Sequence, residues 1–476
     1  MNKHPKTQIM NLVKLCFWLL ILMTGCKKQS VKAPEAVLPI PTQKQLDWQK
    51  EEMLMFVHFG IKTFYPSDNH MGDGLEDPNR FDPVDFDAKQ WVKAALAGGF
   101  KGIVLTSKHH DGFCNWQTET TDHSLKSSAW RDGKGDIVKE LADACHEAGI
   151  MFGLYSSIYD QSYEKSGKDK SAYSDFYIAQ LTELLSNYGK VDELWFDGFG
   201  AENMKVDFKK VSEVIVKYQP EAVIYDSGTL VSHLPDDCVS WPGAHGGVKD
   251  PSWSFIDEKA SWYPPEASLI IQGNWFYHGE PMISQKKLKD YYLNTVGLNA
   301  VALMNVAPNQ KGLIDEETIE GLKTFKKWVD ALHQNDLTRQ EGVKISADSY
   351  RGNSEQFAAE KAIDGNYDTY YATDDQLKAA IIEIDLGEPA EVEGLILQEY
   401  IPLGQRVSEF SIECKIEGHW KKIATQHTIG YKRIILGETK ETNGKPFPKS
   451  RFLRVVISDA RACPLINNIQ VIRKLG

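Results

Sequence analysis

The stretch DIVKELADACHEAGIMFGLYSS, residues 136–157, joins a helical pattern to a strand pattern. Residues 136–149 are amphipathic at helical spacing and close on Gly149, a residue type that often terminates helices. Residues 150–157 form a short apolar run that is typical of a buried strand. A helix that leads directly into a buried strand is part of a strand–helix–strand repeat, the unit from which parallel sheets are built.

The same alternation extends from about residue 50 to residue 335. Seven or eight such units predict a (β/α)8-like barrel, although the loop-rich stretch 229–268 makes the later units hard to separate. The expected strands are 54–60, 102–110, 150–157, 193–200, 222–228, 269–278 and 300–308, and the expected helices are 85–99, 136–149, 174–189, 208–219, 284–297 and 316–333.

The pattern changes after about residue 340, where short strands follow one another without helices. This arrangement is typical of a β-sandwich. We therefore expect an α/β chain of two domains, a barrel over residues 44–337 and a sandwich over residues 340–476. The expected strands of the second domain are 379–387, 391–401, 409–416, 451–459 and 466–475.

The N-terminal residues have the pattern of a targeting segment. Three lysines precede the apolar run 15–23, which is too short to span a bilayer and indicates a signal peptide. The small residues before Cys26 resemble a bacterial lipoprotein cleavage box, with a plain secretory signal as the alternative. We expect residues 1–26 to be a lipoprotein signal peptide and residues 27–43 a flexible tether. The protein would then be exported to the periplasm or cell surface and would contact the membrane only through a lipid on Cys26.

Charge and cysteine content narrow the classes of partner. A formal net charge of −12 argues against nucleic acid or an anionic membrane surface as the main partner. The cysteines show no C-x-x-C spacing, so they do not predict a zinc site. A disulfide between Cys414 and Cys463 is one open interpretation.

Polar side chains recur where the expected barrel strands end. Barrel enzymes build their chemistry at the carboxyl ends of the strands, so these side chains are expected to meet there. A single histidine would be read as a core residue, and a lone Asp-Gly as a turn. A zinc site is a further alternative, but the His-x-x-x-His helix spacing is missing. The residues concerned are His58, His109, His110, Tyr155, Asp197, Asp226, Trp275 and His278.

Several of these segments resemble the α-L-fucosidases of glycoside hydrolase family 29. They are VHFGIKTF (57–64), GLEDPNRFDP (74–83), TSKHHDGFCNWQTETTDHS (106–124), ELWFDG (193–198) and WYPPEASLIIQGNWFYH (262–278). The segments around residues 76 and 275 resemble the branch that cleaves α-1,3- or α-1,4-linked fucose.

The resemblance implies an exo-acting retaining hydrolase that needs no cofactor, with Asp197 as the nucleophile. It also implies a terminal α-L-fucose of a fucosylated glycan as the substrate. The implied substrate-binding residues are His58, Glu76, His109, His110, Trp116, Tyr155, Glu266 and Trp275.

The sequence departs from the family pattern at the second catalytic group. The family branch carries an arginine and an acid/base glutamate, where VSWPGAHGG (239–247) places Ser240 and His245. An imidazole titrates near neutral pH, so we expect His245 to be the acid/base, with Glu258 and Glu266 as rivals. The departure also leaves two alternatives open: an α-L-galactosidase of the same fold, or a glycan-binding protein with little or no activity.

The C-terminal region resembles the discoidin or coagulation factor 5/8 type C sandwich. The resemblance rests on AAEKAIDGNYDTYYATDD (358–375) and IEIDLGEPAEVEGLIL (382–397). It implies a carbohydrate-binding module and a structural calcium with Asp364 as an oxygen ligand. The alternative is that the domain only supports the barrel by packing.

Overall fold

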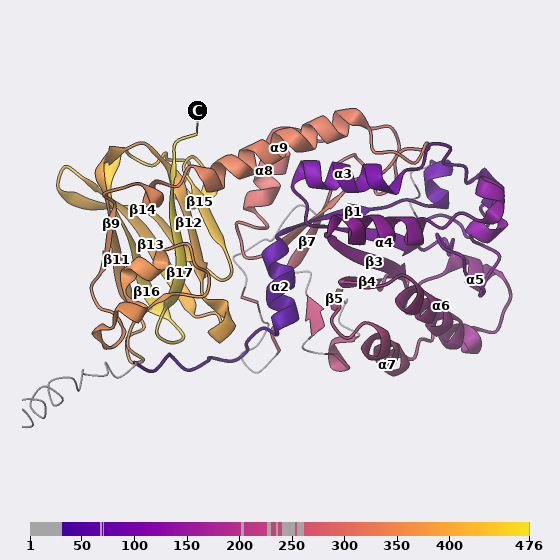
Figure 1. Ribbon diagram of the computed structural model, residues 1–476, viewed down its shortest axis with the longest axis horizontal. Coiled ribbons are helices and arrows are strands. Elements are labelled where there is room, and N and C mark those ends of the chain that lie inside the picture. Colours follow the sequence, from indigo (N-terminus) through magenta and orange to yellow (C-terminus); the bar gives the residue numbers. More distant parts are fainter. Residues whose placement is uncertain are drawn as a thin grey trace, which may run out of the picture.

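The computed structural model describes residues 31–66, 69, 71–200, 204–225, 230–234, 237–239, 253–254 and 261–475. The chain forms a curled parallel sheet wrapped by helices, followed by an antiparallel β-sandwich (Figure 1). This architecture confirms the (β/α)8-like barrel and the sandwich that the sequence predicts. No described helix is both long and apolar enough to cross a membrane.

Eight parallel strands form the barrel sheet in the order β6-β5-β4-β3-β2-β1-β8-β7. Because β1 pairs with both β2 and β8, strands from the two ends of the domain are neighbours. Within the described residues no pairing joins β6 to β7. The strands are β1 Met53–Val57, β2 Gly102–Lys108, β3 Met151–Ser157, β4 Glu193–Asp197, β5 Val223–Tyr225, β6 Cys238–Val239, β7 Glu266–Ile270 and β8 Val301–Asn305.

Helices cover the outside of the sheet, each with one buried face. In α4 the Asp136 side chain accepts the backbone N–H of Lys139, and Gly149 ends the helix in the left-handed conformation at φ 68°. The helices of the barrel domain are α2 Gln43–Glu51, α3 Ala88–Gly98, α4 Ile137–Ala148, α5 Gln161–Lys165, α6 Tyr173–Asn187, α7 Phe208–Tyr218, α8 Gln285–Leu293 and α9 Glu316–Gln334.

Strand β7 lies earlier in the chain than the sequence predicts. It covers Glu266–Ile270, whereas the apolar run 269–278 was expected to form it. The residues after Ile270 are apolar because they pack at the barrel mouth, where Phe276 is buried. Consequently Glu266 starts the strand and lies at the end of the barrel opposite to its mouth.

The second domain packs a four-stranded sheet, β10-β17-β12-β15, against a five-stranded sheet, β14-β13-β16-β11-β9. Cys414 and Cys463 are both buried free thiols, so the disulfide considered between them is not formed; they belong to different apolar clusters. The strands are β9 Lys344–Ala347, β10 Tyr371–Ala372, β11 Ala380–Ala390, β12 Val392–Glu399, β13 Val407–Ile416, β14 His419–His427, β15 Arg433–Leu436, β16 Ser450–Ala460 and β17 Leu465–Arg473.

Residues 31–41 run along one end of the sandwich before the chain enters the barrel at α2 (Figure 1). Three arginine side chains of the sandwich donate hydrogen bonds to backbone carbonyls of this segment, each at 2.6 Å. They are Arg351 to Lys32, Arg406 to Glu35 and Arg461 to Leu38. This part of the expected tether is therefore bound to the second domain.

The barrel and the sandwich are joined by an interface that contains both hydrogen bonds and apolar contacts. The loop before β8 pairs with β15 through backbone hydrogen bonds from Asn299 to Lys432 and from Ile434 to Gly297. Beside it, the buried Lys432 ammonium and the Tyr431 hydroxyl both donate to the Glu52 carboxylate. Sandwich residues Ile434 and Leu436 also belong to the main apolar cluster of the barrel domain, so the two domains are packed as one body.

Candidate active site

Asp197 is the last residue of β4, at the carboxyl end of the barrel sheet. Its Oδ2 accepts the hydroxyl of Tyr155 at 2.8 Å and lies 3.4 Å from Nε2 of His110. Its Oδ1 accepts the backbone N–H of Phe199 at 2.9 Å. About a quarter of the Asp197 side chain, 26%, remains exposed, so a substrate can reach this carboxylate.

These neighbours decide the charge of Asp197. Burial raises the pKa of its carboxyl, but the hydrogen bond and charge of His110, the Phe199 N–H and the Tyr155 hydroxyl outweigh burial. The net result is a pKa below the ordinary aspartate value, so the carboxylate is ionised at neutral pH. His110 is itself fixed by Ser157, whose Oγ lies 2.6 Å from Nδ1.

His58, His109 and Trp275 form the adjoining wall. The rings of His58 and Trp275 are 4.6 Å apart, and His109 stacks on Tyr155 at 5.6 Å. Nδ1 of His58 lies 2.7 Å from Oδ1 of Asn305, whose amide nitrogen donates to the carbonyl of Trp275 at 2.8 Å. Since the amide oxygen is an acceptor, His58 carries a proton on Nδ1.

Two predicted substrate-binding residues lie away from this cluster. Trp116 is fully buried in the outer core, where its indole N–H donates to Glu183 of α6 at 2.9 Å. Glu266 is 2% exposed at the start of β7, and its Oε2 accepts the indole N–H of Trp195 at 2.9 Å. Both predictions were wrong: Trp116 belongs to the barrel wall, and Glu266 lies beneath the site.

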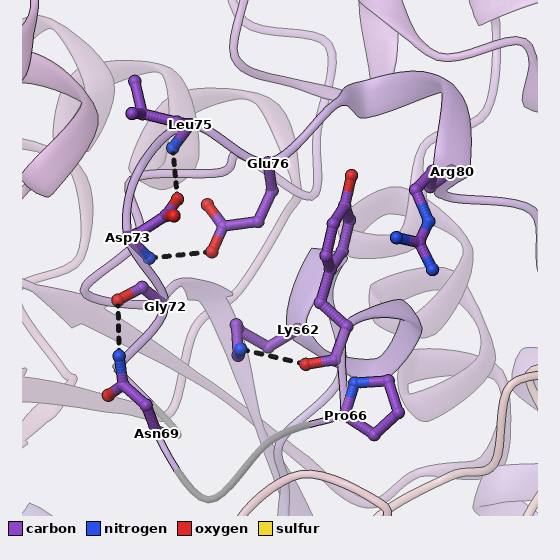
Figure 2. Close-up of a pocket in the computed structure, with 9 residues that line it drawn as sticks. Lys62, Pro66, Asn69, Gly72, Asp73, Leu75, Glu76 and Arg80 are labelled. Carbon is purple, nitrogen blue, oxygen red and sulfur yellow. Dashed lines mark hydrogen bonds between the residues drawn. The ribbon is translucent and has the colours of Figure 1, made fainter.

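Glu76 lines a polar pocket of about 500 Å³ in the loop region after β1 (Figure 2). Its Oε1 accepts the backbone N–H of Asp73 at 2.8 Å. The groups around Asp197 are not among the described lining residues, so contact between Glu76 and the substrate stays a prediction. The lining residues are Lys62, Tyr65, Pro66, Asn69, Gly72, Asp73, Leu75, Glu76 and Arg80.

The candidate acid/base lies outside the described residues. His245 and its rival Glu258 fall in the part of the chain that the structure leaves undescribed, as do Ser240 and Asp226. The role of His245 therefore stays a prediction, while Glu266 is removed as a rival by its position below the mouth.

The calcium expected at Asp364 stays a prediction, and this carboxylate has local partners in its own loop. The Asp364 carboxylate accepts the hydroxyl of Thr369 at 2.7 and 2.9 Å and the N–H of Asn366 at 2.9 Å, and Lys361 lies 3.4 Å away. Among the described residues no group of three histidine, cysteine or acidic side chains could hold a metal ion.

Three residues of the site were missed from the sequence. Asn305 and Ser157 orient His58 and His110, and both are polar residues at the ends of apolar strands. A polar residue at the end of an apolar strand was the sequence signal that could have identified both residues. Phe199 follows Asp197 by two residues and is 63% exposed, and its ring lies 5.6 Å from the ring of His110. An exposed aromatic ring beside the nucleophile position is suited to contact a sugar face.

An ionised aspartate at the mouth of a barrel, surrounded by histidines and aromatic rings, is the arrangement of a glycoside hydrolase. The family model for α-L-fucosidase matches residues 40–334, and the model for the F5/8 type C domain matches residues 344–467. The chain therefore belongs to the α-L-fucosidase family, glycoside hydrolase family 29, and is a glycosidase.

A plant relative and a solved bacterial structure match more than nine tenths of the chain, and a human relative matches about two thirds of it. The chain is 36% identical over 454 residues to α-L-fucosidase 1 of Arabidopsis thaliana, covering 91% of this chain and 87% of that protein. It is 28% identical over 325 residues to human plasma α-L-fucosidase, covering 63% and 66%. A family 29 fucosidase of Ruminococcus gnavus, solved in complex with fucose, superposes with a TM-score of 0.82 at 28% identity, covering 94% of this chain and 97% of that one.

Proposed function

We propose that the protein is an exo-acting retaining α-L-fucosidase that releases terminal fucose from α-1,3- or α-1,4-fucosylated glycans. The observation that carries the proposal is the Asp197 carboxylate, which Tyr155, His110 and the Phe199 N–H hold at the end of β4. Retaining hydrolysis requires such a carboxylate at the anomeric carbon. The fucosidase solved with fucose bound supports the choice of sugar.

In the first step Oδ of Asp197 attacks the anomeric carbon, and the bond to the leaving oxygen breaks. The leaving oxygen takes a proton from the general acid, for which we propose His245. In the second step the neutral imidazole removes a proton from water, whose oxygen attacks the same carbon and releases Asp197. Two inversions give net retention, and the acid is regenerated in its protonated form.

The nucleophile is tested with Asp197→Ala. We expect the variant to lose at least about a thousandfold in kcat on an aryl α-L-fucoside, and azide to restore turnover as β-L-fucosyl azide. With the unaltered enzyme, NMR of the first-formed sugar is expected to show the α-anomer. Undiminished turnover by Asp197→Ala, or a β-anomer as first product, would contradict the assignment.

The acid/base is tested by leaving-group dependence. His245→Ala is expected to slow the cleavage of oligosaccharides strongly and that of aryl fucosides with good leaving groups only weakly, because the latter need no proton. Glu258→Ala is the comparison. If Glu258→Ala has this selectivity and His245→Ala lacks it, the acid is Glu258.

The sugar is tested by parallel assays of p-nitrophenyl α-L-fucoside and α-L-galactoside, which differ only in a hydroxyl at C6. We expect the fucoside to be preferred. A preference for the galactoside would make the protein an α-L-galactosidase, and binding of either sugar without turnover would make it a glycan-binding protein. Comparison of α-1,2-, α-1,3- and α-1,4-fucosylated oligosaccharides tests the linkage.

We further propose that the protein is exported and anchored through a lipid on Cys26, and that its sandwich binds glycan. Export fits the N-terminal sequence, and the sandwich matches a domain type that resembles carbohydrate-binding modules. Metabolic labelling with a radioactive fatty acid is expected to mark the protein and not the Cys26→Ser variant. Equal labelling of both would contradict the anchor.

A further inference from the structure

Two acidic side chains lie together inside the barrel, well below Asp197. Glu193 is the first residue of β4 and Glu266 the first residue of β7, and they are 1% and 2% exposed. Each accepts one indole N–H at 2.9 Å, Glu193 from Trp48 of α2 and Glu266 from Trp195 of β4. The proposed reaction uses neither carboxyl, although buried acids of this kind are uncommon.

The second oxygen of each carboxyl has no other N–H or O–H donor among the residues that the structure describes. Glu193 and Trp195 are two residues apart on β4, so their side chains lie on the same face of the strand, and the bond from Trp195 places the Glu266 carboxyl beside that of Glu193. Such a contact requires one of them to be protonated, since two carboxylates would only repel. A single proton between the carboxyls therefore satisfies both remaining oxygens.

The indole of Trp195 connects this pair to the active site. Its ring stacks on Tyr225 at 3.7 Å and 4°, and on Tyr155 at 5.4 Å and 23°. Tyr155 in turn donates its hydroxyl to Asp197. The orientation of the Trp195 ring, which its bond to Glu266 fixes, thus sets the surface on which Tyr155 rests.

We infer that Glu193 and Glu266 share one proton across the barrel interior and act as positioning residues for the Asp197 nucleophile through Trp195 and Tyr155. The second half of this inference rests on the proposed function, whereas the shared proton does not.

The pKa values of Glu193 and Glu266 agree with a shared proton. Burial raises the pKa of Glu193 to about 7, and burial together with the charge of Glu193 raises the pKa of Glu266 well above the ordinary value. The other ionisable groups acting on the pair in the described structure are Asp192 and Tyr291, and no basic side chain does so. Because the folded protein holds the proton more tightly than the unfolded chain, the stabilisation is complete below about pH 4.5. It is lost as the pH rises through about 7 and above.

Glutamine substitution tests the shared proton without reference to activity. In Glu266→Gln or Glu193→Gln the amide N–H replaces the shared proton, so each single variant is expected to keep its Tm at pH 5. The decrease in Tm from pH 5 to pH 8 should also be smaller in each single variant than in the unaltered protein. In the double variant two amide N–H groups face each other, so at pH 5 it should lose Tm clearly, whereas the losses of the two single variants are expected to be close to zero. Additive losses, or unchanged pH dependence in both single variants, would overturn the shared proton.

The positioning role is tested by kcat and KM on an aryl α-L-fucoside. Glu266→Ala is expected to lower kcat about tenfold with KM within about twofold, and Glu266→Gln to restore most of kcat. Glu183→Ala is the matched control, since Glu183 also accepts a buried tryptophan N–H but does so in the outer wall; its kcat should be unchanged. Equal effects of the two alanine variants would overturn the positioning role. If the unaltered enzyme hydrolyses no fucoside, the proposed function fails, and the Tm measurements still decide the shared proton.

Discussion

Tyr155 donates one hydroxyl hydrogen bond to Asp197, and Tyr155→Phe would remove it. The pKa of Asp197 should then rise, because one of the interactions that lower it is lost. Activity disappears as the pH falls through that pKa, so the acid limb of kcat/KM is expected to move to higher pH in Tyr155→Phe. A hydrogen bond to a charged group contributes about 1.5–3 kcal/mol, so kcat/KM at pH 7 should fall about 10- to 150-fold.

The measurement is a pH profile of kcat/KM on an aryl α-L-fucoside. Tyr163→Phe, which loses a hydroxyl bonded to the carbonyl of Asp169 at 2.8 Å, is the control and should keep the profile. An acid limb that stays in place in Tyr155→Phe would show that this hydroxyl does not tune the nucleophile.

Phe199 has two separable parts, a backbone N–H that binds Asp197 and a ring that is exposed. Phe199→Ala removes only the ring. If the ring contacts the leaving part of the glycan, kcat/KM for a fucosylated oligosaccharide should fall about two- to tenfold. The value for α-L-fucosyl fluoride, which has no leaving sugar, should change less than about twofold. Equal losses on both substrates would place the ring's effect on the nucleophile instead.

Asn305, at the end of β8, connects His58 next to β1 with the loop after β7. In Asn305→Ala His58 loses the acceptor that fixes its tautomer, so KM for the aryl fucoside is expected to rise about tenfold. Asn115 is the control, because it is an equally buried amide that bonds only backbone carbonyls, those of Phe59 and Thr106. Asn115→Ala should lower Tm and leave KM unchanged. A rise of KM in both variants would indicate general loosening of the barrel.

The same elements show what sequence could predict. Barrel helices and strands were largely predictable because each has a continuous apolar pattern, as in residues 136–157. The strand ends also predicted the cluster of His58, His110 and Asp197. The position of β7 was not predictable, because an aromatic-rich run after a strand looks the same whether it continues the strand or packs at the mouth. Trp116 was misassigned because closeness to His109 in the sequence does not determine whether its side chain points into the barrel mouth or into the outer core.

Glu52, at the end of α2, joins the barrel to Lys432 and Tyr431 of the sandwich. Burial raises the pKa of Glu52, but the charge and hydrogen bond of Lys432 outweigh burial and lower it. Lys432→Met would leave this carboxylate without its cation, which should reduce the free energy of unfolding by about 3–5 kcal/mol.

Denaturant unfolding at pH 7 measures this loss. Adding Glu52→Gln to Lys432→Met should restore part of the stability, because no charge then remains unpaired. As the pH falls through the lowered pKa of Glu52, the unaltered protein should lose the contribution of the pair, so its difference from Lys432→Met should shrink. A constant difference from pH 7 to pH 3 would contradict the role of the ion pair.

Residues 31–41 also determine how the molecule would respond to mechanical force applied at its N-terminal side. Their three arginine–carbonyl bonds and the hydrogen bond from the Val37 N–H to the Leu403 carbonyl follow one another along the segment, so a pull would break them one at a time. Eleven residues drawn out at roughly 3.4 Å each have a length of about 37 Å. A pulling force would therefore detach residues 31–41 from the sandwich before it acted on α2. The geometry around Asp197 would be preserved during this detachment.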